Sequence, residues 1–264
     1  MSATYLDVIV EFHRLRAHSD SRIWSDREIA INSRPSLTST LRNARPSGLS
    51  VIAEVKRRSP SRGWIDEHLD PGSLARSYVT GGAAAISVLT DEPHFSGSSS
   101  DLRVVVGAVD VAVLRKDFIV SENDVLDSVE MGASALLLIV AALGIDELSR
   151  YLVLSRAHGI DALVEVHDED ELYRALDAGA TLVGVNQRDL HSFEVDASRA
   201  ERVVSKIPAD VVAVAESGFR TVELVRRAAD VGFDAVLIGE HLVTSDSREQ
   251  FLQECVGAPI GARA

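Results

Sequence analysis

From residue 49 onward, the sequence alternates short apolar runs with longer amphipathic segments, and this alternation repeats eight times. The runs consist mostly of Val, Ile, Leu and Ala, a composition typical of parallel strands that are buried on both faces. Strands are expected at 50–56, 84–89, 111–115, 135–140, 162–166, 181–185, 211–215 and 235–238. Eight strand–helix units in 264 residues favour a closed (β/α)₈ barrel, and no GxGxxG motif opens the first unit to favour a dinucleotide-binding sheet.

Several of the segments between the strands carry helix start and stop signals. Pro71 opens one segment, Asp168 caps a second that ends at Gly179, and Thr221 starts a third that ends at Gly232. These signals assign the connecting segments to helices, as the barrel requires.

The first 48 residues precede the alternating pattern. Residues 4–17 are expected to form an amphipathic helix and residues 26–44 a less regular segment, both packed on the barrel. No low-complexity tract or linker divides the chain. We therefore expect residues 1–264 to form a single α/β domain, a (β/α)₈ TIM barrel with residues 1–48 as an N-terminal helical extension.

Charge and composition exclude several functional classes. With 27 Lys+Arg against 40 Asp+Glu, the net charge of −13 argues against general binding of nucleic acid or of anionic membranes. The single cysteine, Cys255, rules out an internal disulfide or a cysteine-rich metal site and is expected to be a packing residue. Asp7 and Glu11 interrupt the apolar N-terminus, and the longest apolar stretch, 133–145, is short for a bilayer span. A cytoplasmic protein is expected.

Only three of the basic residues are lysines: Lys56, Lys116 and Lys206. In a (β/α)₈ barrel the active site forms where the strands end, and alternate residues of a strand share one face. Lys56 therefore follows Glu54 on the inner face of the first strand, and Lys116 ends the third. Lys206 lies beyond a helix and is expected at the surface.

Other strands end in polar residues in the same way. An isolated Glu-x-Lys is more often a solvated ion pair, but its recurrence weakens that interpretation. The further polar residues at strand ends are Glu165, Asn186, Arg188 and Glu216. Acidic and basic groups that share a cleft are typical of acid–base catalysis, so we predict a catalytic site here.

The last two strands suggest a phosphate subsite. Ser217–Gly218 and Gly239–Glu240 follow strands seven and eight, where backbone N–H groups commonly bind phosphate in such barrels. Glycines there are also ordinary turn residues, and only their position favours the phosphate interpretation. The histidines show no HxH or HExxH spacing, and the acids at 166–171 fit a helix start, so no metal is expected.

Together the motifs resemble the indole-3-glycerol phosphate synthase family of tryptophan biosynthesis. They are IAEVKRRSPSRG at 52–63, ISVLTDEPHFSGS at 86–98, LRKDFIV at 114–120, LVEVH at 163–167, VGVNQRDLHSF at 183–193, VAESGF at 214–219 and VLIGEHL at 236–242. The resemblance implies ring closure of 1-(2-carboxyphenylamino)-1-deoxyribulose 5-phosphate, with loss of CO₂ and water, to indole-3-glycerol phosphate. It implies no metal or organic cofactor, and it leaves association with other tryptophan-pathway enzymes open.

The resemblance also implies roles for the catalytic residues. Lys116 would protonate the substrate carbonyl, and Glu165, supported by Glu54, would help to eliminate the hydroxyl. Lys56 would hold the substrate carboxylate and phosphate, while Asn186 would hydrogen-bond the sugar hydroxyls or the leaving oxygen.

The remaining implied residues bind the substrate. Ser59 and Arg188 would fix the anthranilate carboxylate, with Glu216 and Ser217 lining the site. The phosphate would be bound by Gly218, Gly239 and the Glu240 amide. The apolar slot for the phenyl ring would be formed by Phe95, Phe118, Leu137 and Leu190.

Two other functions would share parts of this pattern. A sugar-phosphate isomerase such as N-(5′-phosphoribosyl)anthranilate isomerase would share the phosphate site, but a Cys or Asp base is expected after its first strand. This chain has Glu54 and Lys56 there, and its only cysteine is Cys255. A non-catalytic scaffold barrel would have lost its charged strand ends, which are intact here.

Overall fold

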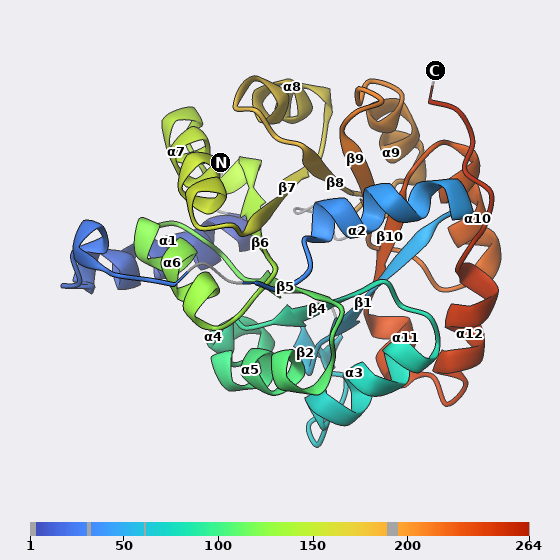
Figure 1. Ribbon diagram of the computed structural model, residues 1–264, viewed down its shortest axis with the longest axis horizontal. Helices are drawn as coiled ribbons and strands as arrows, with labels where there is room; N and C mark the ends of the chain where they lie inside the picture. Colours follow the sequence, from blue (N-terminus) through green and yellow to red (C-terminus); the bar gives the residue numbers. More distant parts are fainter. Residues whose placement is uncertain (1–3, 31–32, 61, 189–194, 264) are drawn as a thin grey trace.

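The computed structural model describes residues 4–30, 33–60, 62–188 and 195–263, and it shows a closed barrel of eight parallel strands (Figure 1). Around the barrel the strands follow the order β1-β10-β9-β8-β7-β6-β5-β4. Their bounds are β1 Ser50–Val55, β4 Ala85–Leu89, β5 Ala112–Lys116, β6 Ala135–Ile139, β7 Asp161–Val166, β8 Leu182–Asn186, β9 Val212–Glu216 and β10 Ala235–Ile238. Each expected strand is confirmed to within one residue at either end, as is the (β/α)₈ fold.

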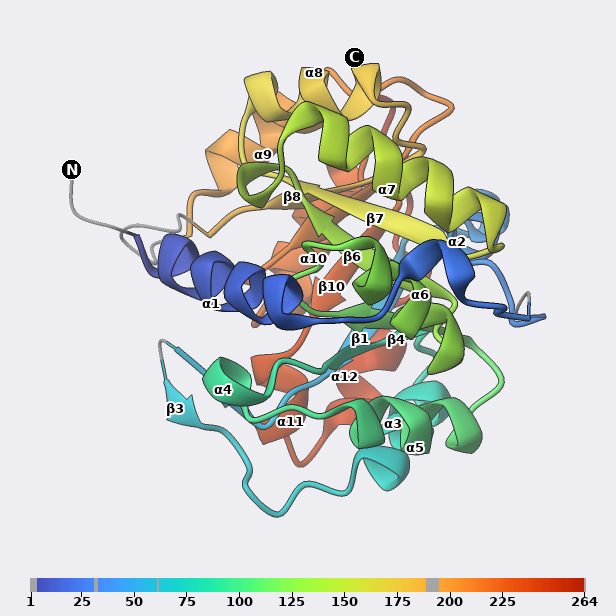
Figure 2. The same cartoon turned by 90° about the vertical axis from the view of Figure 1, so that its left-hand side faces the viewer.

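Helices connect successive strands and surround the barrel (Figure 2). They are α3 Pro71–Thr80, α4 Glu92–Phe95, α5 Ser99–Ala108, α6 Glu122–Glu130, α7 Ile145–Ala157, α8 Glu169–Asp177, α9 Ala197–Val204, α10 Val222–Asp230, α11 Glu240–Thr244 and α12 Arg248–Cys255, with a 3₁₀ turn η3 at Val140–Ala142. The loop after β1 adds an unexpected hairpin, β2 Arg58–Ser59 against β3 Gly63–Trp64. The expected starts at Pro71, Asp168 and Thr221 are confirmed, the latter two as N-caps. None of the described helices is long and apolar enough to span a bilayer.

Alternate strand residues build two apolar cores. Outward-facing side chains such as Val51 and Val55 pack against the helices, whereas Ile52 and Leu114 pack inside the barrel. The interior set contains Ile52 but not its strand neighbours, which confirms the period-two assignment made for the first strand. Cys255 is fully buried in the outer core, as expected for a packing residue.

The extension closes the N-terminal end of the barrel. Helix α2 (Leu37–Ala44) buries Leu37 and Leu41 completely within the interior core. The Ser36 hydroxyl and the Thr38 backbone N–H donate to Asp161 Oδ2, at 2.7 and 2.9 Å, where β7 begins. Within the expected less regular segment 26–44, residues 37–44 thus form an α-helix. The 3₁₀ turns η1 (Trp24–Asp26) and η2 (Arg45–Ser47) flank this region.

Helix α1 (Tyr5–Ser19) confirms the expected N-terminal helix and lies on the opposite side of the barrel from α2 (Figure 2). A capping box between Thr4 and Asp7 starts it. Ion pairs from Arg14 to Glu147 and from Arg16 to Asp124 hold it against the first turns of α7 and α6. The extension therefore covers both ends of the barrel.

Candidate active site

A single pocket brings the predicted residues together at the C-terminal ends of the strands. Fifteen of the sixteen predicted site residues line it: Glu54, Lys56, Ser59, Phe95, Lys116, Phe118, Leu137, Glu165, Asn186, Arg188, Glu216, Ser217, Gly218, Gly239 and Glu240. The sixteenth, Leu190, lies outside the described residues. The barrel thus gathers at one mouth residues that lie more than 180 positions apart in the sequence, from Glu54 to Glu240. 

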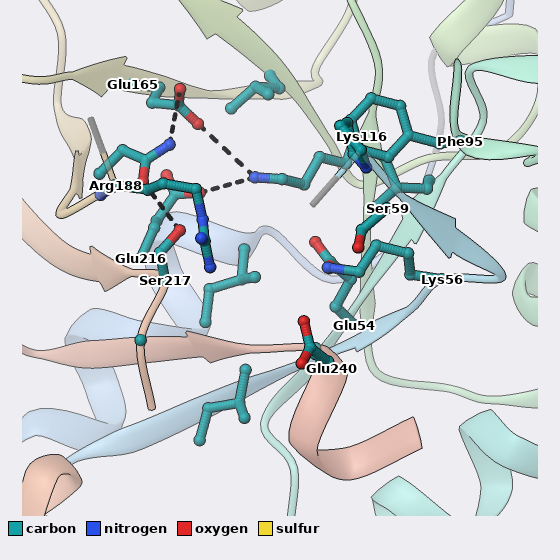
Figure 3. A pocket seen from close by; sticks show the side chains of 18 of the residues that line it. Glu54, Lys56, Ser59, Phe95, Lys116, Glu165, Arg188, Glu216, Ser217 and Glu240 are labelled. Carbon is teal, nitrogen blue, oxygen red and sulfur yellow. Dashed lines mark hydrogen bonds and ion pairs between the residues drawn. The ribbon is translucent and has the colours of Figure 1, made fainter. Parts of the chain in front are cut away.

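Lys116 lies between two carboxyl groups at the centre of this pocket. Its Nζ is 2.8 Å from Glu216 Oε2 and 3.6 Å from Glu165 Oε2. Figure 3 shows the lysine, which ends β5, pointing toward the two glutamates of β7 and β9. All three side chains are largely shielded from solvent. The ammonium group is therefore held in place by ion pairs that solvent screens only weakly.

The surroundings of these groups set their protonation. Burial favours the neutral amine of Lys116, but Glu216 and Glu165 outweigh it and raise the pKa above its usual value. Burial raises the pKa of Glu216 to about 7, with Lys116 opposing that rise and Glu165 adding to it. For Glu165, Lys116 and His167 outweigh burial, so its pKa is lowered. At neutral pH the site holds an ammonium, an ionised Glu165 and a Glu216 close to its titration midpoint.

A hydrogen-bonded chain continues from Glu165 along the rim. Asn186 Nδ2 donates to Glu165 Oε1 at 3.3 Å, and Asn186 Oδ1 accepts from Ser217 Oγ at 2.9 Å and from the Arg188 backbone N–H at 3.0 Å. These bonds fix which end of the Asn186 amide faces the carboxylate. The ends of β8 and β9 are thereby tied to the central glutamate.

A second lysine–carboxylate pair lies across the pocket. Lys56 Nζ is 2.7 Å from Glu54 Oε1, and both side chains are mostly buried (Figure 3). Gly239 lies against this pair, because a Cβ at that position would overlap Glu54 Oε1 and lie 3.1 Å from Lys56 Nζ. The close approach of backbone and ion pair explains why the chain carries glycine there.

The glycine-rich ends of β9 and β10 form one wall. Ser217 and Gly218 both have positive φ, 72° and 87°, and Gly239 precedes the short helix α11. The Glu240 carboxylate is 2.8 Å from Arg62 and 3.8 Å from Arg220. That side chain is therefore already paired with cations, and only the Glu240 backbone amide suits an anion.

Apolar side chains form the other wall, which includes residues that were not predicted from the sequence. Phe95 and Phe118 lie with ring centroids 6.1 Å apart, as members of the expected slot. Helix α1 adds Tyr5, Leu6 and Ile9 to the lining. Nothing in the local sequence of α1 signals this, because its position depends on contacts with distant loops.

A buried cluster joins α1 to the aromatic wall. His13 Nε2 lies 2.8 Å from Asp91 Oδ1, and His94 Nδ1 lies 3.2 Å from the same carboxylate. The His13 ring packs on Phe118 with centroids 5.4 Å apart, and Asp91 also accepts the backbone N–H groups of His94 and Phe95. These three groups could hold a metal ion by type and spacing. In the structure their polar atoms hydrogen-bond one another and couple α1 to the slot.

The elevated pKa of Glu216 predicts a measurable dependence of stability on pH. The folded state retains the Glu216 proton up to about pH 7, whereas the unfolded chain releases it near 4.5. Between those values the folded state binds more protons, so the stability contributed by this group falls as pH rises. Glu216→Gln removes that contribution. Urea unfolding at pH 5 and pH 7.5 should show a smaller loss of stability in the variant than in the wild type; equal losses would contradict the assignment.

Comparisons with known sequences point to one family. The sequence model described as indole-3-glycerol phosphate synthase matches residues 10–255. The indole-3-glycerol phosphate synthase of Parafrankia sp. is 50% identical over 210 residues, covering 80% of this chain and 78% of that protein. That of Mycolicibacterium vanbaalenii is 44% identical over 259 residues, covering 97% and 95%.

A solved structure supports the fold alone. Thiamine phosphate pyrophosphorylase from Pyrococcus furiosus superposes with a TM-score of 0.60 at 14% identity, covering 81% of this chain and 96% of that one. The family match and the curated relatives cover most of the chain at much higher identity. The chain therefore belongs to the indole-3-glycerol phosphate synthase family.

Proposed function

We propose that this pocket closes the ring of 1-(2-carboxyphenylamino)-1-deoxyribulose 5-phosphate, with loss of CO₂ and water, and so acts as a decarboxylating lyase that forms indole-3-glycerol phosphate. The observation that carries the proposal is the Lys116 ammonium held between Glu216 and Glu165. An aromatic slot and a glycine-lined wall flank it within the same pocket. The substrate has a phenyl ring, a carbonyl and a phosphate that match these three features.

Lys116 acts as the acid of the first step. A bond forms between the ring carbon that bears the carboxylate and the carbonyl carbon, and the carbonyl oxygen takes a proton from the Lys116 ammonium. Departure of CO₂ then restores the aromatic ring. Glu216 then protonates the neutral amine of Lys116, because its Oε2 is 2.8 Å away and its pKa of about 7 leaves a proton available.

Glu165 acts in the dehydration that follows. The hydroxyl leaves as water when it receives a proton, and a second proton must leave the neighbouring ring carbon. The reprotonated Lys116 donates the proton to the leaving hydroxyl, and the ionised Glu165 accepts the proton from the ring carbon. Glu54 supports the step by holding Lys56 at 2.7 Å. Over the whole reaction one proton is taken up, and it replaces the carboxylate that departs as CO₂.

The remaining residues bind the substrate. Lys56 holds its carboxylate and phosphate, with Asn186 at the sugar oxygens. Ser59 and Arg188 fix the anthranilate carboxylate, and Ser217 lines the site beside them. The phosphate lies against Gly218, Gly239 and the Glu240 amide, and the phenyl ring lies in the slot of Phe95, Phe118 and Leu137. Each of these residues lines the pocket, which supports the assignment.

We also propose that residues 1–264 act as one domain in the cytoplasm. Helix α1 lines the pocket and α2 fills the base of the barrel, so the extension is part of the folded unit. Association with other tryptophan-pathway enzymes stays a prediction.

One assay tests the reaction. Purified protein is mixed with 1-(2-carboxyphenylamino)-1-deoxyribulose 5-phosphate, and the indole chromophore of the product is followed by its fluorescence. A signal that rises in proportion to enzyme concentration is expected. No signal, together with isomerisation of N-(5′-phosphoribosyl)anthranilate, would favour the isomerase alternative.

A further inference from the structure

The two carboxyl groups around Lys116 differ in their other contacts. Among the described residues, Glu216 forms its only ion pair with Lys116. Glu165 also accepts from Asn186 and faces the imidazole of His167, whose Nε2 lies 3.6 Å from Glu165 Oε1. The proposed mechanism gives opposite tasks to the two carboxyls, yet both are buried and both contact the same lysine. A neighbouring group must therefore give the two carboxyls different proton affinities.

The His167 ring is held in an orientation in which one of its nitrogens faces Glu165. It follows β7 directly and is 8% exposed. Its Nδ1 lies 3.0 Å from Glu171 Oε2, and its backbone N–H donates to the same oxygen at 2.8 Å. Glu171 lies in the first turn of α8, where its own N–H donates to the N-cap Asp168. With Nδ1 held by Glu171, the other nitrogen faces Glu165.

The groups that face His167 favour its charged form. Burial favours the neutral ring, but Glu171 of α8, Glu165 of β7 and Glu216 of β9 outweigh it and raise the pKa of His167. An imidazolium so placed carries positive charge toward one carboxyl of the pair, because its ion-pair contact is with Glu165.

We propose that His167 keeps the Glu165 carboxyl ionised beside Lys116 and thereby directs the shared proton of the site to Glu216. His167 is a positioning residue, since it acts through Glu165 and does not line the pocket. The proposal rests on the proposed function only in the task it gives to Glu165. Its physical content is the difference in proton affinity between two glutamates, which exists with or without substrate.

The test measures that difference directly. Carbon-13 carboxyl NMR of glutamate-labelled protein follows the titration of Glu165, identified by the signal missing in Glu165→Gln. In His167→Gln, which keeps hydrogen-bonding ability but loses the charge, the Glu165 midpoint should move to higher pH. His167→Asn provides a second variant should the first fail to fold. Glu169→Gln is the matched control, because this partly exposed residue of the same helix turn pairs with Arg202 at 3.8 Å.

An unchanged Glu165 midpoint in folded His167→Gln and His167→Asn would overturn the proposal. A shift of the same size in Glu169→Gln would also overturn it, by assigning the effect to general charge. Neither result depends on turnover, so a protein that fails the substrate assay still tests His167.

Activity gives a second readout. With Glu165 more readily protonated, kcat/KM of His167→Gln should fall about tenfold relative to the wild type near pH 6 and recover toward alkaline pH. A purely structural role would lower activity by the same factor at every pH, and that outcome would contradict the proposal.

Discussion

We expect Lys116→Met to lower kcat by about a thousandfold, because methionine keeps most of the side-chain volume and removes the proton donor at the carbonyl. In the proposed mechanism the Glu216 proton reaches the substrate only through Lys116, whose ion-pair partners are Glu216 and Glu165. The loss is measured as the initial rate of indole formation at saturating substrate. KM should change less than kcat, since phosphate and phenyl ring are bound elsewhere in the pocket.

Lys206→Met is the matched control, because it makes the same chemical change at an exposed lysine in the part of the chain that the structure describes. It should retain wild-type kcat. Lys116→Arg tests the donor itself, since arginine keeps the charge but gives up its proton far less readily. Circular dichroism and thermal melting must show that each variant is folded. Turnover of folded Lys116→Met within tenfold of the wild type would remove Lys116 from the mechanism.

The strand pattern made much of this site predictable. Alternate residues of a strand face opposite sides as a matter of backbone geometry, so Ile52, Glu54 and Lys56 were assigned to the barrel interior without knowledge of any contact. Closure of the barrel then brings the ends of all eight strands to one mouth. That is why Lys116 and Glu216, 100 residues apart, could both be expected in one cavity.

Contacts made by side chains across the chain were not predictable in the same way. His13 and Asp91 are 78 residues apart, and neither lies on a strand whose direction is fixed by the barrel. The pocket contribution of Tyr5, Leu6 and Ile9 follows from that contact and from similar ones. The acids at 166–171 were correctly expected to begin a helix. The helix start nevertheless also fixes the ring of His167, which the pattern of charges does not reveal.

The small number of lysines is consistent with their placement in the site. Arginine would place a bulkier, permanently charged guanidinium group at each position. The pKa of Lys116 is raised, so the group is fully charged before the reaction and becomes a useful acid only when a partner replaces its proton. Glu216, with a pKa of about 7, is suited to that task. The lysine and its carboxyl pair should therefore be regarded as one catalytic unit.

Gly239→Ala tests the opposite wall of the pocket and should lower kcat/KM about a hundredfold. The added Cβ would overlap Glu54 Oε1 and crowd Lys56 Nζ, so the ion pair must move. Displacement of Lys56 and of the neighbouring backbone should weaken phosphate binding and raise KM more than it lowers kcat. Inorganic phosphate offers a check without turnover, because it should raise the melting temperature of the wild type more than that of the variant.

Gly107→Ala is the matched control for this change. Gly107 lies in α5 with no atom within 4 Å of an added Cβ, and alanine favours the helix by about 1 kcal/mol. It should keep wild-type kcat/KM and melt no lower than the wild type. If Gly239→Ala matched Gly107→Ala in KM and in its response to phosphate, the anion subsite could not lie against Gly239. The substrate phosphate would then have to be bound elsewhere, and the proposed orientation of the phenyl ring in the aromatic slot would change with it.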